Sequence, residues 1–203
     1  MSKAKLILVC VTLAILIVSV FAACAPAAPA KPAATTPPAA TTPPAATTPP
    51  AATGPITAPK TSYAATTYTN DQYGFIFVYP SAMTSATPKA KYNVLEAAEA
   101  MGVPTVGVSI LDTAKMEDET TESLTSVGGS DIKTVSTTDV TLADGKTKGK
   151  LTELAWKSSG YDITTLSIAV DRSGKTISVS YTSLKDMIDA KIAKEVINTL
   201  TFK

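Results

Sequence analysis

The sequence contains no histidine, and its 203 residues include only two cysteines, Cys10 and Cys24. The absence of histidine excludes Ser-His and Cys-His nucleophilic catalysis and the zinc sites that depend on imidazole. Because both cysteines lie within the first 24 residues, we expect no disulfide in the rest of the chain. We therefore expect a folded part that is stabilised by packing alone, without a cofactor or a metal site.

Net charge is also low. After residue 23 the chain holds 16 basic residues (18 less Lys3 and Lys5) and 17 acidic residues, so its net charge is −1. This balance gives no electrostatic reason to expect a nucleic-acid partner.

The N-terminal segment has the order of an export signal. Lys3 and Lys5 precede an apolar run over residues 6–21, and small residues follow it. The lysines are expected to hold this end in the cytoplasm and to place the remainder of the chain on the other side of the membrane.

The end of the apolar run resembles the lipobox of bacterial lipoproteins. Ala22-Ala23-Cys24 matches its small residues and cysteine, whereas Phe21 stands where those signals usually have leucine. The resemblance implies cleavage between Ala23 and Cys24 and attachment of a diacylglyceryl group to the Cys24 thiol. The mature protein would then be bound to the cell membrane through this lipid, facing the extracytoplasmic side, because two or more acyl chains anchor stably. The alternative is an uncleaved transmembrane helix, since residues 6–23 reach the lower length limit for a span.

A low-complexity linker follows. The hexapeptide Ala-Ala-Thr-Thr-Pro-Pro occurs three times over residues 33–50, and 11 of the 14 prolines lie in residues 25–60. Paired prolines favour extended polyproline II structure, in which this segment would span about 110 Å. We assign residues 1–23 to a signal peptide, 24–67 to an Ala/Thr/Pro-rich disordered linker and 68–203 to a globular domain. The linker is either a stalk or a passive tether.

Alternation and turn residues predict the elements of the globular domain. A strand is expected over residues 73–79, and Asn93 with Glu96 resembles a capping box for a short helix that ends at Gly102. A further strand is expected over 105–111 and a weaker helix over 117–127. Four strands in a meander then follow, over residues 132–142, 146–156, 161–170 and 176–181.

The last predicted strand alternates apolar Ile177, Val179 and Tyr181 with Ser178 and Ser180, so its two faces differ. A terminal helix capped by Ser183 and Asp186 carries one apolar stripe to Leu200. The predicted class is α+β, a single domain with an antiparallel sheet flanked by helices.

Two segments of this domain resemble PsbP-like proteins. Residues 73–80, YGFIFVYP, are similar to the opening strand of that family, and the meander with a terminal helix running into residues 198–202, NTLTF, is similar to its end. The resemblance implies an α/β/α sandwich. In photosynthetic members it also implies an extrinsic subunit that helps to assemble photosystem II and to retain its calcium and chloride. The metal-binding histidines of the family have no counterpart in this chain, so we carry over the fold and not the function.

No motif assigns a catalytic residue or a metal ligand. Ser130 and Lys133 fit S-x-x-K but are expected at the start of a strand, and the two Gly-Lys-Thr triplets at 145–147 and 174–176 are expected in hairpin turns. Trp156 is expected in the core rather than as a ligand platform. Two clusters of charged side chains are expected to have structural roles. An acidic cluster is expected to begin a helix; its members are Glu117, Asp118, Glu119 and Glu122. Alternating lysines are expected to protect an edge strand rather than bind an anionic polymer; they are Lys146, Lys148 and Lys150.

These patterns favour a membrane-anchored extracytoplasmic module that is not an enzyme and binds or assembles with an unknown envelope protein or small ligand. The alternative is a hydrolase or metal enzyme that acts on envelope material through carboxylates. Acidic side chains that converge in one cleft would favour the enzyme. A sheet face with only apolar and hydroxyl groups would favour binding.

Overall fold

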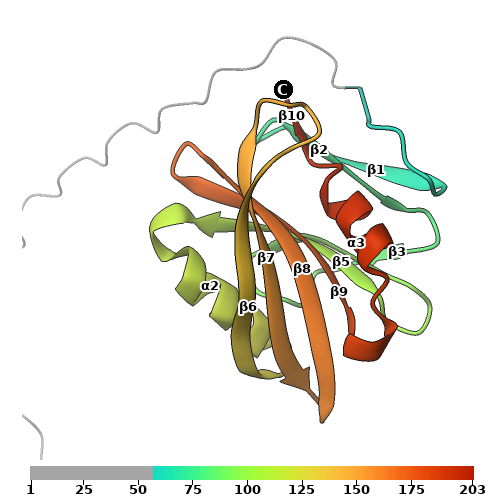
Figure 1. Ribbon diagram of the computed structural model, residues 1–203, viewed down its shortest axis with the longest axis vertical. Helices are drawn as coiled ribbons and strands as arrows, with labels where there is room; N and C mark the ends of the chain where they lie inside the picture. The colour runs from blue at the N-terminus through green and yellow to red at the C-terminus, as the bar shows by residue number, and fades with distance from the viewer. Residues whose placement is uncertain (1–56) are drawn as a thin grey trace, which may run out of the picture. The chain divides into compact units, whose positions relative to one another are not determined.

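The computed structural model describes residues 57–203 (Figure 1). The predicted signal peptide, Cys24 and most of the predicted linker lie outside these residues. Within the described part, no helix has the length and apolarity needed to cross a membrane.

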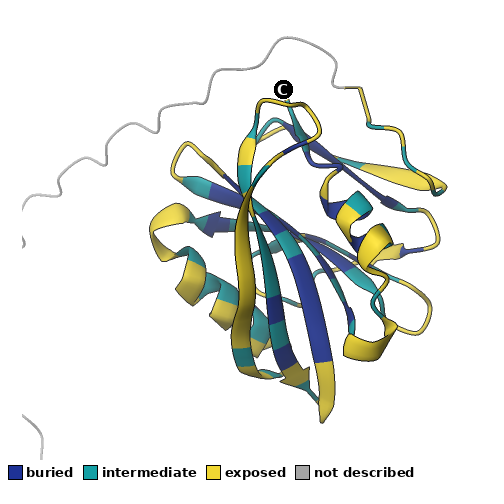
Figure 2. Cartoon of the chain, viewed as in Figure 1, coloured by how far each residue is buried: buried dark blue, intermediate teal, exposed yellow. Residues whose placement is uncertain are grey.

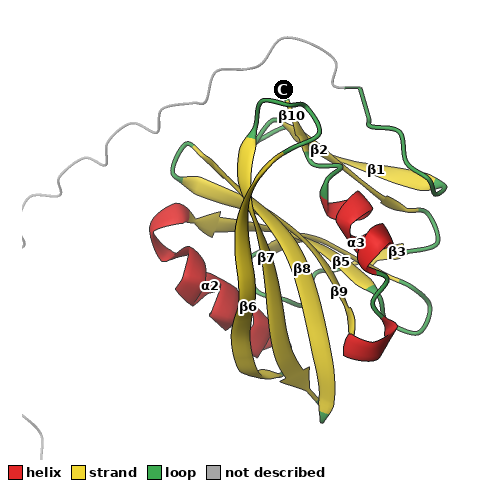
Figure 3. Ribbon diagram, in the orientation of Figure 1, coloured by secondary structure: helices red, strands yellow, loops and turns green. Residues whose placement is uncertain are grey.

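Most of the strands form one antiparallel sheet of seven strands in the order β3-β4-β5-β9-β8-β7-β6 (Figure 3). Its strands are β3 (Thr84–Ala86), β4 (Asn93–Ala98), β5 (Thr105–Asp112), β6 (Gly129–Thr141), β7 (Lys148–Ser158), β8 (Tyr161–Arg172) and β9 (Lys175–Leu184). A second sheet, in the order β1-β2-β10, contains β1 (Ala65–Asn70), β2 (Phe75–Pro80) and β10 (Thr201–Phe202).

Two α-helices occur in the described residues, α2 (Met116–Ser126) and α3 (Ala190–Ile197). A 3-10 turn precedes each of them, Thr113–Lys115 and Lys185–Met187, respectively. Together these elements confirm the predicted α+β class with an antiparallel sheet.

The alternation of strand residues gives the large sheet two different faces. Edge strand β6 is exposed along most of its length (Figure 2). On β9, Ile177, Val179 and Tyr181 are buried in the main core together with Ala193, Val196 and Ile197 of α3. The residues between them face the other way. On that other face Leu154, Trp156 and Ile163 form a smaller apolar cluster, against which Leu124 of α2 packs. The two helices therefore contact opposite faces of the sheet.

The predicted meander, the strand 73–79, the strand 105–111 and the helix 117–127 are all confirmed, with ends that move by a few residues. β2 is buried over five consecutive residues, as an apolar run without alternation predicts.

The predicted helix at residues 93–102 is wrong, because this segment contains strand β4. Leu95 and Ala97 are buried at a period of two, and β4 pairs with β3 on one side and β5 on the other. The Glu96 carboxylate caps no helix. It accepts hydrogen bonds from the backbone N–H groups of Lys89 and Ala90 at 2.9 and 3.3 Å. Sheet pairing therefore overrides the local capping pattern.

The predicted start of the terminal helix is also wrong. Ser183 belongs to β9, where it pairs with Thr164, and the helix begins only at Ala190. Its N-cap is Asp189, whose carboxylate accepts hydrogen bonds from the N–H groups of Lys191 and Ile192.

The lysines predicted to protect an edge strand do not lie on one. Lys148 and Lys150 are in β7, which pairs with β6 and β8, and Lys146 lies in the preceding turn. The edge strand next to β7 is β6, whose ladder is interrupted by register shifts between Ser130 and Lys133 and between Thr134 and Ser136. Such bulges disfavour pairing with another strand, so they take the role assigned to the lysines.

The described fold includes residues before Tyr68. Ser62 donates hydrogen bonds from its backbone N–H and its hydroxyl to the Glu195 carboxylate of α3, at 2.5 and 2.6 Å. These two bonds lower the pKa of Glu195. Tyr63 packs against the main core, and burial, followed by the charge of Glu195, raises the pKa of its phenol. β1 begins at Ala65.

Candidate functional site

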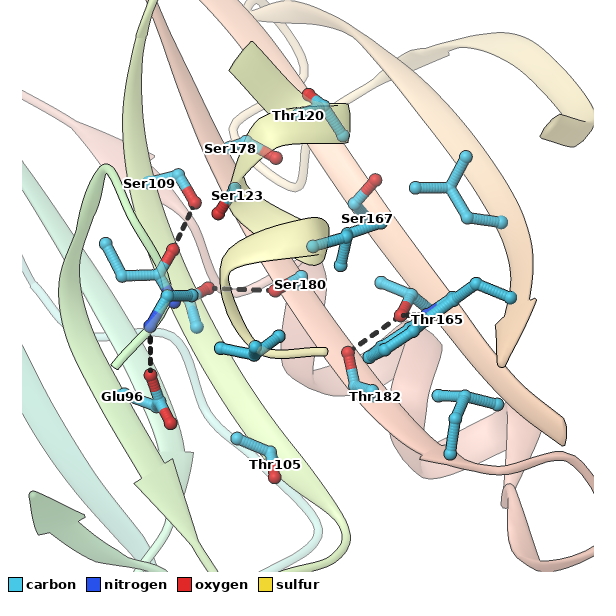
Figure 4. A pocket seen from close by; sticks show the side chains of 18 of the residues that line it. Glu96, Thr105, Ser109, Thr120, Ser123, Thr165, Ser167, Ser178, Ser180 and Thr182 are labelled. Atoms are coloured by element: carbon cyan, nitrogen blue, oxygen red, sulfur yellow. Dashed lines mark hydrogen bonds between the residues drawn. The ribbon is translucent and has the colours of Figure 1, made fainter. Parts of the chain in front are cut away.

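A cavity of about 290 Å³ lies between α2 and the face of the large sheet that α2 covers (Figure 4). Its floor comes from β5, β9 and β8, which are neighbours in the sheet. Its sides come from α2, from β4 and from residues of the loop that precedes β4.

Most of the floor residues bear a hydroxyl group. Side chains two residues apart share a face of a strand, and register aligns them across neighbouring strands. Thr182 of β9 is opposite Thr105 of β5 and Thr165 of β8, and Ser180 is opposite Gly107 and Ser167. The hydroxyl-bearing residues of these three strands that line the cavity are Thr105, Ser109, Thr165, Ser167, Ser178, Ser180 and Thr182.

One end of the cavity is apolar. Trp156, the only tryptophan in the sequence, is 8% exposed and packs with Leu154 and Ile163. Its indole Nε1–H donates a hydrogen bond of 3.0 Å to Thr165 Oγ1, which lies 2.8 Å from Thr182 Oγ1. Trp156 is therefore a core residue, as predicted, and it also contributes to the wall of the cavity.

Several floor hydroxyls already have partners within the protein. Thr105 donates to the carbonyl of Gly102 at 2.9 Å, and Ser109 donates to Asn93 Oδ1 at 2.6 Å. Ser167 and Ser178, in contrast, have no side-chain partner among residues 57–203. No fully buried side-chain oxygen or nitrogen in this part of the chain lacks a partner, so these two hydroxyls face open space in the cavity.

The loop before β4 forms a strap over one side of the cavity, which we define as residues 89–92. Its Lys91 backbone is fixed to α2 at both ends of the residue: the N–H donates to Ser126 Oγ at 3.0 Å, and the carbonyl accepts from Ser123 Oγ at 2.6 Å. Tyr92 OH donates to Glu122 at 2.5 Å, and Lys91 Nζ pairs with the other oxygen of the same carboxylate. Hydrogen bonds from Lys91 and Tyr92 lower the pKa of Glu122.

Charged groups are few in this cavity. Lys89 and Glu96 are the only charged side chains among its lining residues. Lys89 is exposed, and Glu96 is occupied by the two backbone N–H groups of the strap. Two acids held at a fixed separation, as carboxylate-based hydrolysis requires, are therefore not present in its lining.

The residues examined for chemistry in the sequence lie elsewhere. Ser130 and Lys133 are exposed on edge strand β6 and pair with Lys157 and Ala155, at a bulge rather than in a site. In the acidic cluster Glu119 accepts a hydrogen bond from the N–H of Asp112, and Glu122 holds the strap. Among residues 57–203 no group of three histidine, cysteine or acidic side chains is placed to hold a metal ion.

The hairpin turn at residues 143–147 is closed by a side chain. Asp144 accepts hydrogen bonds from the N–H groups of Lys146 and Thr147, each at 2.8 Å. The Gly-Lys-Thr triplet here is part of a turn, as predicted. Cys10, Ala23 and Cys24 lie outside the described residues, so the cleavage and lipidation site remains a prediction.

The floor of the cavity was not identified in the sequence, although part of its signal is present. The alternation of Ser178 and Ser180 with apolar residues indicates a polar face on one strand. The matching serines and threonines of β5 and β8 join that face only through the strand order, which a single sequence does not specify.

Comparison of the sequence with protein-family models gives no match, and comparison with curated proteins gives none either. Comparison of the structure does give matches. The solution structure of cyanobacterial PsbP (CyanoP) from Synechocystis sp. PCC 6803 is similar at a TM-score of 0.53 and 13% identity, over 74% of this chain and 100% of that chain.

Two crystal structures match less well. One, from Bacteroides thetaiotaomicron VPI-5482, has a TM-score of 0.46 and 15% identity over 68% of this chain and 48% of that chain. The other, a protein of unknown function from Pseudomonas aeruginosa, has a TM-score of 0.32 and 14% identity over 60% of this chain and 84% of that chain. The similarity to CyanoP supports a PsbP-like fold for this chain.

Proposed function

We propose that this protein is a lipid-anchored extracytoplasmic binding module that is not an enzyme. In this proposal Cys24 carries the lipid, the residues between Cys24 and Ser62 tether the domain to the membrane, and the PsbP-like domain holds a small ligand between α2 and the sheet. The finer arrangement we propose for the domain is the α/β/α sandwich, which the contacts of α2 and α3 with opposite sheet faces support.

One observation carries the binding role: an open cavity with unpartnered hydroxyl groups on its floor and an apolar wall. Ligand sites are typically concave and mostly apolar, with a few polar groups that fix orientation. The same lining can be compared with the alternative function, a hydrolase or metal enzyme that uses carboxylates. The lining contains a single carboxylate, Glu96, which accepts hydrogen bonds from backbone N–H groups, so the cavity gives that alternative no support.

The anchor is tested by intact mass of the protein extracted from the membranes of its host. We expect a mature chain that begins at Cys24 and carries acyl groups, and a Cys24→Ser variant that carries none. An unmodified species that begins before Ala22 would contradict the anchor.

The binding role is tested by native mass spectrometry of the same protein, released in a non-ionic detergent. We expect a small noncovalent adduct on the wild type. Ser178→Phe, which places a ring in the cavity, should lose the adduct, and Ser136→Phe on the exposed face of β6 should keep it. A wild type without any adduct, or an adduct that Ser178→Phe retains, would contradict binding at this cavity.

A further inference from the structure

We infer that the cavity selects an uncharged, largely apolar molecule that presents one polar group to the hydroxyls of Ser167 and Ser178. This inference rests on the proposed binding role and names the class of ligand.

The floor is amphipathic along the direction of the strands. The strand register aligns the side chains of neighbouring strands in rows across the sheet. From the first of these rows to the fourth, the side chains change from apolar to polar. The first row holds Trp156, Ile163 and Leu184. The second row holds Leu154, Thr165, Thr182 and Thr105. The third row holds Ser167 and Ser180 beside Gly107, and the fourth holds Ser178 and Ser109.

The two unpartnered hydroxyls lie close enough to bind one polar group of a ligand. Ser167 is directly opposite Ser180, so Ser178, two residues along β9, is its diagonal neighbour. Diagonal pairs on one sheet face are about 7–8 Å apart. A polar group that has both a donor atom and an acceptor atom, such as an amide, can therefore bridge the two hydroxyls, because each hydroxyl can donate or accept a hydrogen bond.

Gly107 keeps the polar end open. A Cβ atom at this position would lie 3.0 Å from Ser180 Oγ and 3.1 Å from Asn93 Nδ2. Both distances are tighter than ordinary contact, so any side chain there would press on these polar atoms. With glycine, the amide of Asn93 and the hydroxyl of Ser180 line the same space as Ser167 and Ser178.

The charges of the lining argue against an ionic ligand. Glu96 already accepts two backbone hydrogen bonds, and Lys89 is exposed. A buried ion without a partner of opposite charge loses several kcal/mol of hydration. A hydroxyl or amide loses far less when its hydrogen bonds are replaced, and the hydroxyl floor replaces them. The volume of about 290 Å³ is at the lower end for ligand sites, which suits a molecule about the size of a substituted benzene.

The test uses a matched series of small compounds that share one ring: phenylacetamide, phenylacetate, 2-phenylethylammonium and ethylbenzene. The full-length protein is reconstituted in phosphatidylcholine vesicles, and protein-free vesicles give the blank. Trp156 fluorescence reports binding, since it is the only tryptophan and lies in the cavity wall. We expect the two ions to bind at least about tenfold more weakly than phenylacetamide, because Lys89 is exposed to solvent and the Glu96 carboxylate already accepts two hydrogen bonds, so neither ion gains a free buried partner of opposite charge.

The role of the serines is tested with a double variant, Ser167→Ala with Ser178→Ala. We expect it to weaken phenylacetamide binding by about fivefold and to change ethylbenzene binding by less than about twofold, because only the amide hydrogen-bonds to the floor. Ethylbenzene thereby also reports that the variant is folded. The matched control, Ser136→Ala with Thr138→Ala, changes two exposed hydroxyls of β6 and should leave both compounds unaffected.

Three results would overturn the inference: ions that bind as tightly as phenylacetamide, an alanine pair that leaves phenylacetamide unchanged, or no response of Trp156 to any compound. Its failure is distinct from failure of the proposed function. A charged adduct in native mass spectrometry that Ser178→Phe abolishes would remove the ligand class and keep the binding role. A wild type without any native adduct, together with no response of Trp156 to any compound, would contradict the binding role itself.

Discussion

Replacement of Thr199 by valine should destabilise the domain through one hydrogen-bonding group. Thr199 follows α3, is 3% exposed, and faces Val78 of β2. Its Oγ1 accepts from the Val78 N–H at 2.9 Å and lies 2.8 Å from the carbonyl oxygens of Val78 and Val196. β10 pairs with β2 only at Thr201 and Phe202, opposite Ile76 and Phe75. The Thr199 hydroxyl stands where the next rung of that ladder would be.

Thr199→Val keeps the shape of the side chain and removes the hydroxyl. The buried N–H of Val78 would then lack a partner on this side, which costs about 1–3 kcal/mol. We expect the free energy of unfolding to fall by about 2 kcal/mol, measured by urea denaturation with Trp156 fluorescence, and Tm to fall by roughly 4–8 °C for a domain of this size. Thr199→Ser retains the hydroxyl and should cost only about 1 kcal/mol, for the lost methyl.

The matched control is Thr138→Val, the same change at an exposed position of β6, for which we expect a change within about 0.5 kcal/mol. A Thr199→Val protein that unfolds within the same margin of the wild type would show that the hydroxyl does not replace a rung of the ladder. A Thr199→Ser protein as unstable as Thr199→Val would show that the methyl group, and not the hydroxyl, is responsible.

Three further changes test other contacts. The pKa of Glu122 is lowered in the folded state, so its bonds to the strap should be present above its unfolded pKa and lost as pH falls through the lowered value. The protection factors of the strap amides should fall over this range in the wild type, and Glu122→Gln should make these protection factors independent of pH there. Gly129→Ala would place a Cβ 2.6 Å from the Leu124 carbonyl oxygen, so we expect denaturation to show a loss of about 1–3 kcal/mol, against a change within about 0.5 kcal/mol for the exposed neighbour Ser130→Ala. Glu195→Gln should increase hydrogen exchange at the Ser62 amide, and unchanged exchange there would contradict the contact.

The sequence predicts the part of the fold in which local signals agree. Turn residues at 143–145, 158–160 and 171–174 separate segments that alternate at a period of two, so each hairpin of the meander is specified by its neighbours along the chain. The acidic start of α2 and the apolar run of β2 are local signals of the same kind.

The errors arise where distant pairing decides the structure. Asn93 and Glu96 have the spacing of a helix cap, but β3 and β5 lie on either side of them and hydrogen-bond the segment as a strand. Ser183 likewise has the pattern of a cap and pairs with Thr164. The candidate site depends on the same information, because Ser167 and Ser178 meet only after β8 and β9 are placed side by side.

Alternate residues of β8 and β9 lie on opposite faces of the sheet, and the two faces have different roles. Ile168 and Val179 are buried in the main core, whereas Ser167 and Ser178, adjacent to them in sequence, line the cavity. Changes to the lining residues can therefore accumulate during evolution with little effect on the core beneath. One scaffold built in this way can diversify its ligands while its architecture stays the same.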